Sequence, residues 1–205
     1  MLTFEQFLTE AATNGEAVNT MFEERLFDLV GVLHRIADTL TAEHIPYEVI
    51  GGLAVLIHVE EVSPELSSLT RDVDLMVHRA DLERIKEVAA QSGFKFRHAA
   101  GVDMLLYGDA GTTKNAVHLV FSEEKVRSDY ITPTPSITPQ RKSIHGKDVM
   151  VIPVADLLVM KLTSFRLKDQ VHIKTIDAAG LLTPAVETRL TPELAARLKQ
   201  VRETE

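Results

Sequence analysis

The chain has 205 residues, a formal net charge of −8, and neither cysteine nor tryptophan. This length suffices for one domain with its own core, or for a domain with a small helical appendage. Without cysteine there are no disulfides or thiolate metal sites, and the acidic balance disfavours nucleic acid as a partner unless a local basic patch opposes it. No apolar run reaches the roughly 18 residues of a membrane span, and the acidic N-terminus lacks the basic region of a signal peptide. We therefore expect a cytoplasmic protein with no membrane partner.

The first half of the chain predicts a helix followed by strands and helices in alternation. Apolar residues recur at helical spacing from Met21 to Glu43, which predicts a long amphipathic helix. The next elements are a strand at 47–50, a glycine turn at Gly51-Gly52, a helix over 53–59, a loop over 60–69, a strand over 72–78 and a helix over 81–91.

The second half predicts more strands and then only helices. Strands are expected at 94–98, 103–107 and 116–121, a hairpin over 144–152, and helices over 154–168, 170–179 and 192–202. This order predicts an α/β (α+β) fold, a small mixed sheet flanked by helices, with a helical C-terminal part. We place an α/β domain at 1–152 and a helical region at 153–205.

Two carboxylates lie two residues apart on a predicted strand. Asp72 and Asp74 alternate with Val73 and Leu75, so both side chains are expected on one face. Like charges at this spacing are unfavourable unless a cation lies between them, and Mg²⁺ takes such oxygen ligands together with substrate phosphates. The pattern indicates a metal site, and a solvated strand face is the alternative.

The Gly51-Gly52 turn also has two interpretations. Glycine permits a tight strand-to-helix turn by adopting φ > 0. It equally lets backbone N–H groups approach a phosphate closely, at the positive end of the following helix.

Taken together, the two motifs resemble those of the DNA polymerase beta-like nucleotidyltransferase superfamily. The matching segments are Val49–Ala54, which contains the glycine pair, and Leu69–Leu75, which contains the acidic pair. Two helical segments, 153–162 and 166–172, narrow the resemblance to bacterial nucleotidyltransferases of abortive-infection and toxin–antitoxin systems. The resemblance covers about residues 45–180.

The resemblance implies transfer of a nucleotidyl group from an NTP to an acceptor, with release of pyrophosphate. Asp72 and Asp74 would bind Mg²⁺ or Mn²⁺. The acceptor (tRNA, protein or small molecule) is not identified by the sequence, and the resemblance also implies a toxin role and an antitoxin partner. The residues assigned to nucleotide binding are Gly51, Gly52, Thr70, Arg71 and Lys161.

The sequence departs from the superfamily at the third carboxylate. The strand expected to carry it is Ala116–Phe121, and His118 stands at its central position as a candidate catalytic residue. A histidine accepts a proton near neutral pH but supplies no negative charge. Asp103 is a second candidate, and Glu123 lies beyond the strand end. Two rival hypotheses follow: a catalytically impaired member that binds nucleotide or a partner, and a D-x-D glycosyltransferase.

Other polar residues have structural alternatives. Lys161 is either a triphosphate ligand or a solvated helix charge, and Asp169 is expected to act as a helix N-cap. We expect His172 and Lys174 to face solvent. Basic residues, among them Lys142 and Lys147, surround the predicted hairpin. We expect them to lie on a solvated edge of the sheet.

Overall fold

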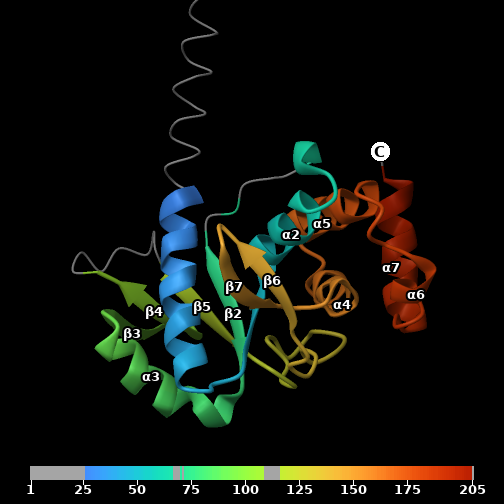
Figure 1. Cartoon of the computed structure of the whole chain (residues 1–205). Coiled ribbons are helices and arrows are strands. Elements are labelled where there is room, and N and C mark those ends of the chain that lie inside the picture. Colours follow the sequence, from blue (N-terminus) through green and yellow to red (C-terminus); the bar gives the residue numbers. More distant parts are fainter. Residues whose placement is uncertain (1–25, 67–69, 71, 109–115, 205) are drawn as a thin grey trace, which may run out of the picture.

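The computed structural model describes residues 26–66, 70, 72–108 and 116–204 (Figure 1). In this part of the chain, one mixed sheet has the strand order β3-β4-β5-β2-β1-β7-β6. The strands are β1 (Tyr47–Ile50), β2 (Val73–Val77), β3 (Phe94–Ala99), β4 (Val102–Tyr107), β5 (Ala116–Phe121), β6 (Gln140–Ile144) and β7 (Lys147–Val151). The predicted mixed sheet flanked by helices is confirmed.

The first helix is described from 26 to 42, and the predicted start at 21–25 lies outside the described residues. The remaining helices are α2 (Gly51–Glu60), α3 (Leu82–Gln91), α4 (Val154–Ser164), α5 (Leu167–Ala178), α6 (Pro184–Glu187) and α7 (Pro192–Glu203), with 3-10 turns η1 (Pro64–Leu66) and η2 (Arg79–Asp81).

The predicted helix over 154–168 is wrong in its C-terminal part. Helix α4 ends at Ser164 because Phe165 adopts a left-handed conformation with φ 49°, and Arg166 then serves as the N-cap of α5. Left-handed backbone cannot continue a right-handed helix, so the chain changes direction here. Apolar periodicity continues through the break, which is why the sequence pattern did not reveal it.

Strand β2 lies near the middle of the sheet and fixes the register of its neighbours. It pairs antiparallel with β1, where Ile50 faces Asp74, and parallel with β5, where Asp74 faces His118. Paired residues of neighbouring strands present their side chains on the same face. The three positions therefore form one row across the sheet.

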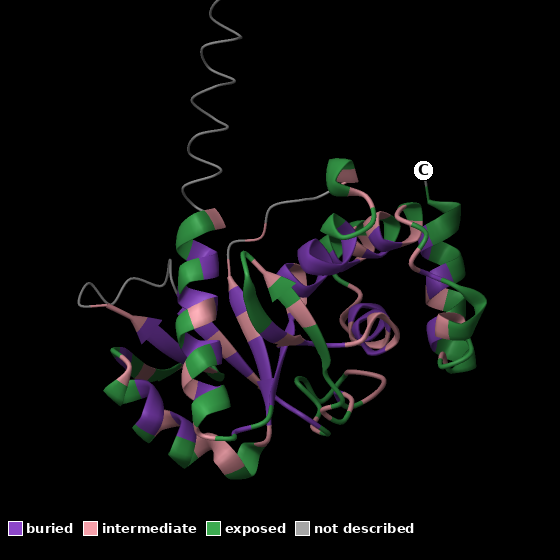
Figure 2. Cartoon of the chain, in the orientation of Figure 1, coloured by how far each residue is buried: buried purple, intermediate pink, exposed green. Residues whose placement is uncertain are grey.

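Helix α2 joins the sheet to the C-terminal helices. It packs against β1 and β2 on one side and against α4 and α5 on the other. In Figure 1, α4, α5, α6 and α7 gather on the right of the sheet, while the first helix crosses in front of it. Figure 2 shows that the central strands are largely buried.

A single buried apolar cluster includes residues from both sides of Pro153, for example Leu33, Val49, Leu158 and Leu198. Position 152/153 therefore marks the change from strands to helices within one continuous core. Its role as a domain boundary stays a prediction.

Candidate functional site

The two acidic residues lie at the start of β2. Asp72 immediately precedes the strand and Asp74 is its second residue. Every other residue of β2 is buried, whereas Asp74 is partly exposed. A carboxylate in an otherwise apolar central strand is costly unless it faces solvent, a partner or a ligand.

The glycine turn lies directly against Asp74. Gly51 has φ +72°, and a Cβ built on it would come within 2.0 Å of the Asp74 Oδ2 atom. Even alanine at position 51 would therefore both strain the backbone and displace the carboxylate. The sequence requires glycine here for close approach as well as for the turn.

The second glycine borders two further side chains. A Cβ on Gly52 would lie 2.7 Å from Thr70 Oγ1 and 3.4 Å from His172 Cε1. Thr70 therefore lies beside the glycine turn, and its contact with a nucleotide stays a prediction. Arg71 lies outside the described residues.

His118 contacts Asp74 from the neighbouring strand. Its Nδ1–H donates a hydrogen bond to Asp74 Oδ1 over 3.1 Å, and both side chains are a little over a quarter exposed (28% and 29%). This hydrogen bond raises the pKa of His118, with the charges of Asp74 and Asp72 acting in the same direction. The two Asp74 oxygens thus have different neighbours: Oδ1 faces His118 and Oδ2 faces Gly51.

Asp103 and Glu123, the two other candidates for the third carboxylate, do not join the row formed by Ile50, Asp74 and His118. Asp103 pairs in register with Leu119, one position away from His118, and the alternation of a strand puts it on the other face. Its carboxylate accepts a hydrogen bond from His98 instead. Glu123 accepts one from Ser136 in the segment after β5. The hypothesis that Asp103 replaces the third carboxylate is wrong because the register directs it away.

Lys161 is buried rather than solvated. Its ammonium donates to Asp169 over 3.1 Å, and the two side chains are 6% and 0% exposed. Burial lowers the pKa of Lys161, while Asp169 and Asp74 oppose that effect. The solvated alternative for Lys161 is therefore excluded, and direct contact with a nucleotide stays a prediction.

Asp169 is not the predicted N-cap. It lies in the first turn of α5, where Ser164 and Arg166 also donate to its carboxylate. Burial alone would raise the pKa of Asp169, but these hydrogen bonds and the charge of Lys161 lower it to about 2. The carboxylate therefore fixes the junction between α4 and α5.

His172 is a residue that the sequence analysis missed. Its ring lies against Gly52, and its Nδ1 atom is buried with no hydrogen-bond partner. Burial lowers its pKa to about 4, and the charges of Lys161, Lys168 and Arg166 act in the same direction. The expectation that it faces solvent is wrong because α5 packs against α2. The spacing of Lys168 and His172, one helical turn apart, was the only signal in the sequence.

The donor atoms at this place fit a hard divalent cation. Within the described residues no group of three His, Asp or Glu side chains is arranged to hold a metal ion. Mg²⁺, however, is commonly bound by one or two carboxylates, with substrate phosphates and water completing its shell. Asp72 and Asp74 are the predicted pair, and the turn beside Asp74 Oδ2 has no side chains of its own, as a backbone that approaches phosphate oxygens requires.

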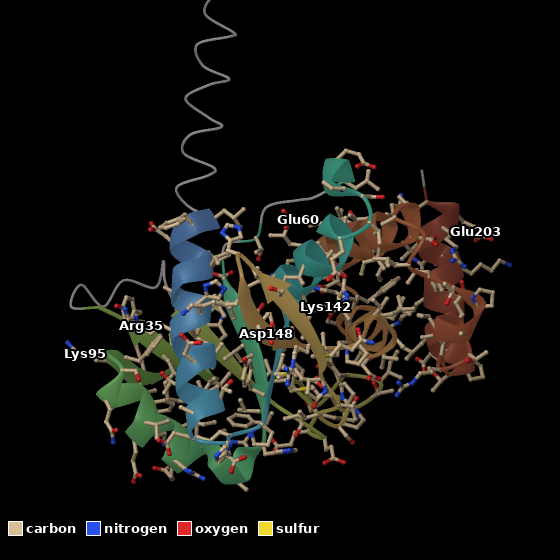
Figure 3. The ribbon with its side chains drawn as sticks, viewed as in Figure 1. Arg35, Glu60, Lys95, Lys142, Asp148 and Glu203 are labelled. Atoms are coloured by element: carbon tan, nitrogen blue, oxygen red, sulfur yellow. The ribbon has the colours of Figure 1, made fainter. Side chains whose placement is uncertain are left out.

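The basic residues of the β6–β7 hairpin are paired with acids. Lys142 contacts Glu61 over 2.6 Å and Lys147 contacts Asp38 over 2.7 Å. Lys142 and Asp148 are labelled on this hairpin in Figure 3. These contacts support the prediction of a solvated edge and give no reason to assign it to a nucleic-acid partner.

The order of strands, the glycine turn and the acidic strand together define the nucleotidyltransferase fold. The chain belongs to the family described as nucleotidyl transferases of unknown function (DUF2204), whose model matches residues 30–203. No curated protein matches the chain.

Solved structures with this fold are similar at low sequence identity. The antibiotic-resistance factor ANT(2'')-Ia has a TM-score of 0.54 at 11% identity, with 84% of this chain and 90% of that chain covered. An antigenic nucleotidyltransferase-like protein from Paracoccidioides brasiliensis has a TM-score of 0.54 at 18% identity, with 85% and 87% covered. The Megavirus polyadenylate synthase has a TM-score of 0.53 at 10% identity, with 89% of this chain but 39% of that one covered. At these identities the likeness concerns the fold.

No helix in the described part of the chain has both the length and the apolar character needed to cross a bilayer.

Proposed function

We propose that this protein is a Mg²⁺- or Mn²⁺-dependent nucleotidyltransferase that moves a nucleotidyl group from an NTP to a hydroxyl of an acceptor. The observation that carries the proposal is the contact between the glycine turn and Asp74, whose carboxylate occupies the space a side chain at Gly51 would need. This contact supports the proposal because a metal–triphosphate needs a phosphate-binding turn and a metal-binding carboxylate next to each other.

In this proposal Asp72 and Asp74 hold the metal ion, and the turn at Gly51-Gly52 holds the β- and γ-phosphates. The bound ion supplies charge neutralisation at the α-phosphate and at the departing pyrophosphate. Thr70 borders the turn, and the cationic residues of α4 and α5 add positive charge. Lys168 is exposed and can turn toward phosphates, whereas Arg166 and Lys161 pair with Asp169 and add positive charge from those positions, Lys161 close enough to interact with Asp74.

His118 is the proposed general base. Asp74 accepts its Nδ1–H, which leaves Nε2 of the neutral ring with a lone pair for a proton. The acceptor O–H gives its proton to Nε2 as the oxygen bonds to the α-phosphorus. The bond from the α-phosphorus to the oxygen bridging to the β-phosphate breaks, and pyrophosphate leaves.

The experiment is transfer of label from α-labelled NTPs, with Mg²⁺ or Mn²⁺, to candidate acceptors. ANT(2'')-Ia has been seen with adenylyl-2''-tobramycin and the Megavirus enzyme is a polyadenylate synthase, so small polyhydroxylated molecules and RNA 3′ ends are the first classes to test, with tRNA and protein beside them. Asp74→Asn should abolish transfer. Asp148→Asn, on the hairpin, is the control and should retain it.

A catalytically impaired member is the second candidate, favoured by the histidine at the position of the third carboxylate. It predicts stabilisation of the protein by NTP and Mg²⁺ without transfer to any acceptor. The glycosyltransferase hypothesis predicts binding of UDP- or GDP-sugars instead, and the family match favours nucleotidyl transfer over it.

A toxin role and an antitoxin partner belong to the same proposal. Expression of the protein in bacteria should then arrest growth, and Asp74→Asn should relieve the arrest. Growth that is equally slow with both proteins would contradict a toxic activity based on this site.

A further inference from the structure

The glycine turn has a polar neighbour that the mechanism above does not use. His172, on α5, presents its Cε1 carbon to Gly52 at a distance of 3.4 Å from the place a Cβ would occupy. Cε1 is bonded to both ring nitrogens, so Nδ1 and Nε2 each lie close to the turn.

The protonation state of this ring follows from its surroundings. Burial lowers the pKa of His172 to about 4, so the ring is neutral at physiological pH. Nδ1 is buried without a partner. An unpartnered lone pair is tolerated better than an unpartnered N–H among buried groups, which favours the tautomer with its proton on Nε2. The ring is therefore a hydrogen-bond donor through Nε2.

The first turn of α2 has no side-chain donor of its own for a polyphosphate. Its N-cap residue is Ile50, which has no side-chain oxygen, and its first residues are the two glycines, so α2 contributes no acidic side chain of its own here; the nearby carboxylate is that of Asp74 on β2. Lys161, Lys168 and Arg166 all lie close enough to affect the charge state of His172. Backbone donors of α2 and a neutral imidazole donor of α5 meet here beside the cation of Lys168, while Lys161 and Arg166 pair with Asp169.

We propose that His172 is a phosphate-binding residue of this protein, donating a hydrogen bond from Nε2 to a non-bridging oxygen of the triphosphate held at the Gly51-Gly52 turn. This inference rests on the proposed function, since it assumes that a triphosphate binds there. The proposed hydrogen bond would come from the C-terminal helices, so that the nucleotide would contact both α2 and α5.

The test measures binding of Mg²⁺–tripolyphosphate by calorimetry, because the base of the nucleotide is not known. The variants are His172→Ala and His172→Asn, the second retaining an N–H donor. His34→Ala is the matched control, since His34 also has a buried ring nitrogen without a partner but lies by the β6–β7 hairpin, near Lys147 and Ile144. Thermal unfolding of each free variant is recorded beside binding.

His172→Ala should weaken binding about tenfold, the effect of one hydrogen bond to a charged group, and His172→Asn should recover part of the loss. Binding of inorganic monophosphate should change much less, and His34→Ala should bind like the wild type. Loss of thermal stability in His172→Ala with unchanged tripolyphosphate affinity would overturn the inference and leave His172 a packing residue.

Transfer assays separate this inference from the proposed function. If the wild type transfers label and His172→Ala has the same KM for NTP, the inference fails and the proposed function stands. If the wild type neither binds tripolyphosphate nor transfers label, both fail.

Discussion

Asp74 and His118 meet over 3.1 Å at directly paired positions of two parallel strands, β2 and β5. The same chemical pair occurs elsewhere in the sheet, where His98 contacts Asp103 over 2.5 Å between β3 and β4. Only the first pair lies beside the glycine turn. The His98–Asp103 pair is therefore an internal control for the Asp74–His118 pair, because it has the same chemical groups but lies away from the glycine turn.

His118→Ala should lower kcat for nucleotidyl transfer by about 100-fold or more, because a positioned general base typically contributes a factor of this order. KM for NTP should change little, since His118 is proposed to act on the acceptor hydroxyl. Steady-state kinetics with the identified acceptor measures both. His98→Ala should leave kcat unchanged, and an equal loss in both variants would contradict the role of His118 as the base.

Gly51→Ala should abolish NTP binding and transfer, because the new Cβ would lie 2.0 Å from Asp74 Oδ2. The control is Gly146→Ala, which has a similar backbone (φ +78°) but open space around the added atom. Gly146→Ala should lose about 1–2 kcal/mol of unfolding free energy from left-handed strain. Gly51→Ala should lose more, because its Cβ also displaces Asp74, and only Gly51→Ala should lose function. Transfer retained by Gly51→Ala would show that the contact with Asp74 is not needed.

Asp169→Ala should lower the free energy of unfolding by about 3 kcal/mol or more, because it leaves the buried Lys161 ammonium without its partner. The exposed pair Lys199–Glu203 offers the comparison, and Glu203→Ala should cost less than about 1 kcal/mol. Urea unfolding at neutral pH measures both values. Adding Lys161→Met to Asp169→Ala should restore part of the loss, and no recovery would argue against an uncompensated charge as the cause.

Glu48 predicts a pH dependence of stability. This β1 carboxyl is fully buried, accepts a hydrogen bond from the Thr138 N–H, and has a second oxygen without a partner. Burial raises its pKa from 4.5 to about 7, so the folded state retains a proton that the unfolded state has lost. Its contribution is fully present below pH 4.5 and is lost as the pH rises through 7, on the order of 3 kcal/mol in total.

Glu48→Gln copies the protonated carboxyl and should remove this part of the decline. The measurement is the free energy of unfolding at pH 5 and at pH 8 for both proteins. The variant should be close to the wild type at pH 5 and more stable at pH 8. A decline of equal size in the variant would assign the pH dependence to other groups.

The sequence was sufficient for features that depend on local periodicity and on special backbone conformations. Alternation over 72–78 revealed the strand that carries Asp74, and the two glycines marked the start of α2. The β6–β7 hairpin was predicted from its turn at His145-Gly146, which the structure confirms. Each of these follows from neighbours along the chain, which periodicity and turn preferences report directly.

Contacts between distant segments were decided only by the tertiary structure. Periodicity within 94–121 does not reveal that β5 lies parallel to β2 while β4 lies farther out. The family resemblance pointed to His118, but only this strand order shows that His118 contacts Asp74 and that Asp103 is directed away. Likewise, the packing of α5 on α2 put His172 against Gly52 and buried the pair of Lys161 and Asp169. Periodicity along the chain indicates which side of a helix or strand is apolar. Which other helix or strand packs against that side depends on how the whole core is buried.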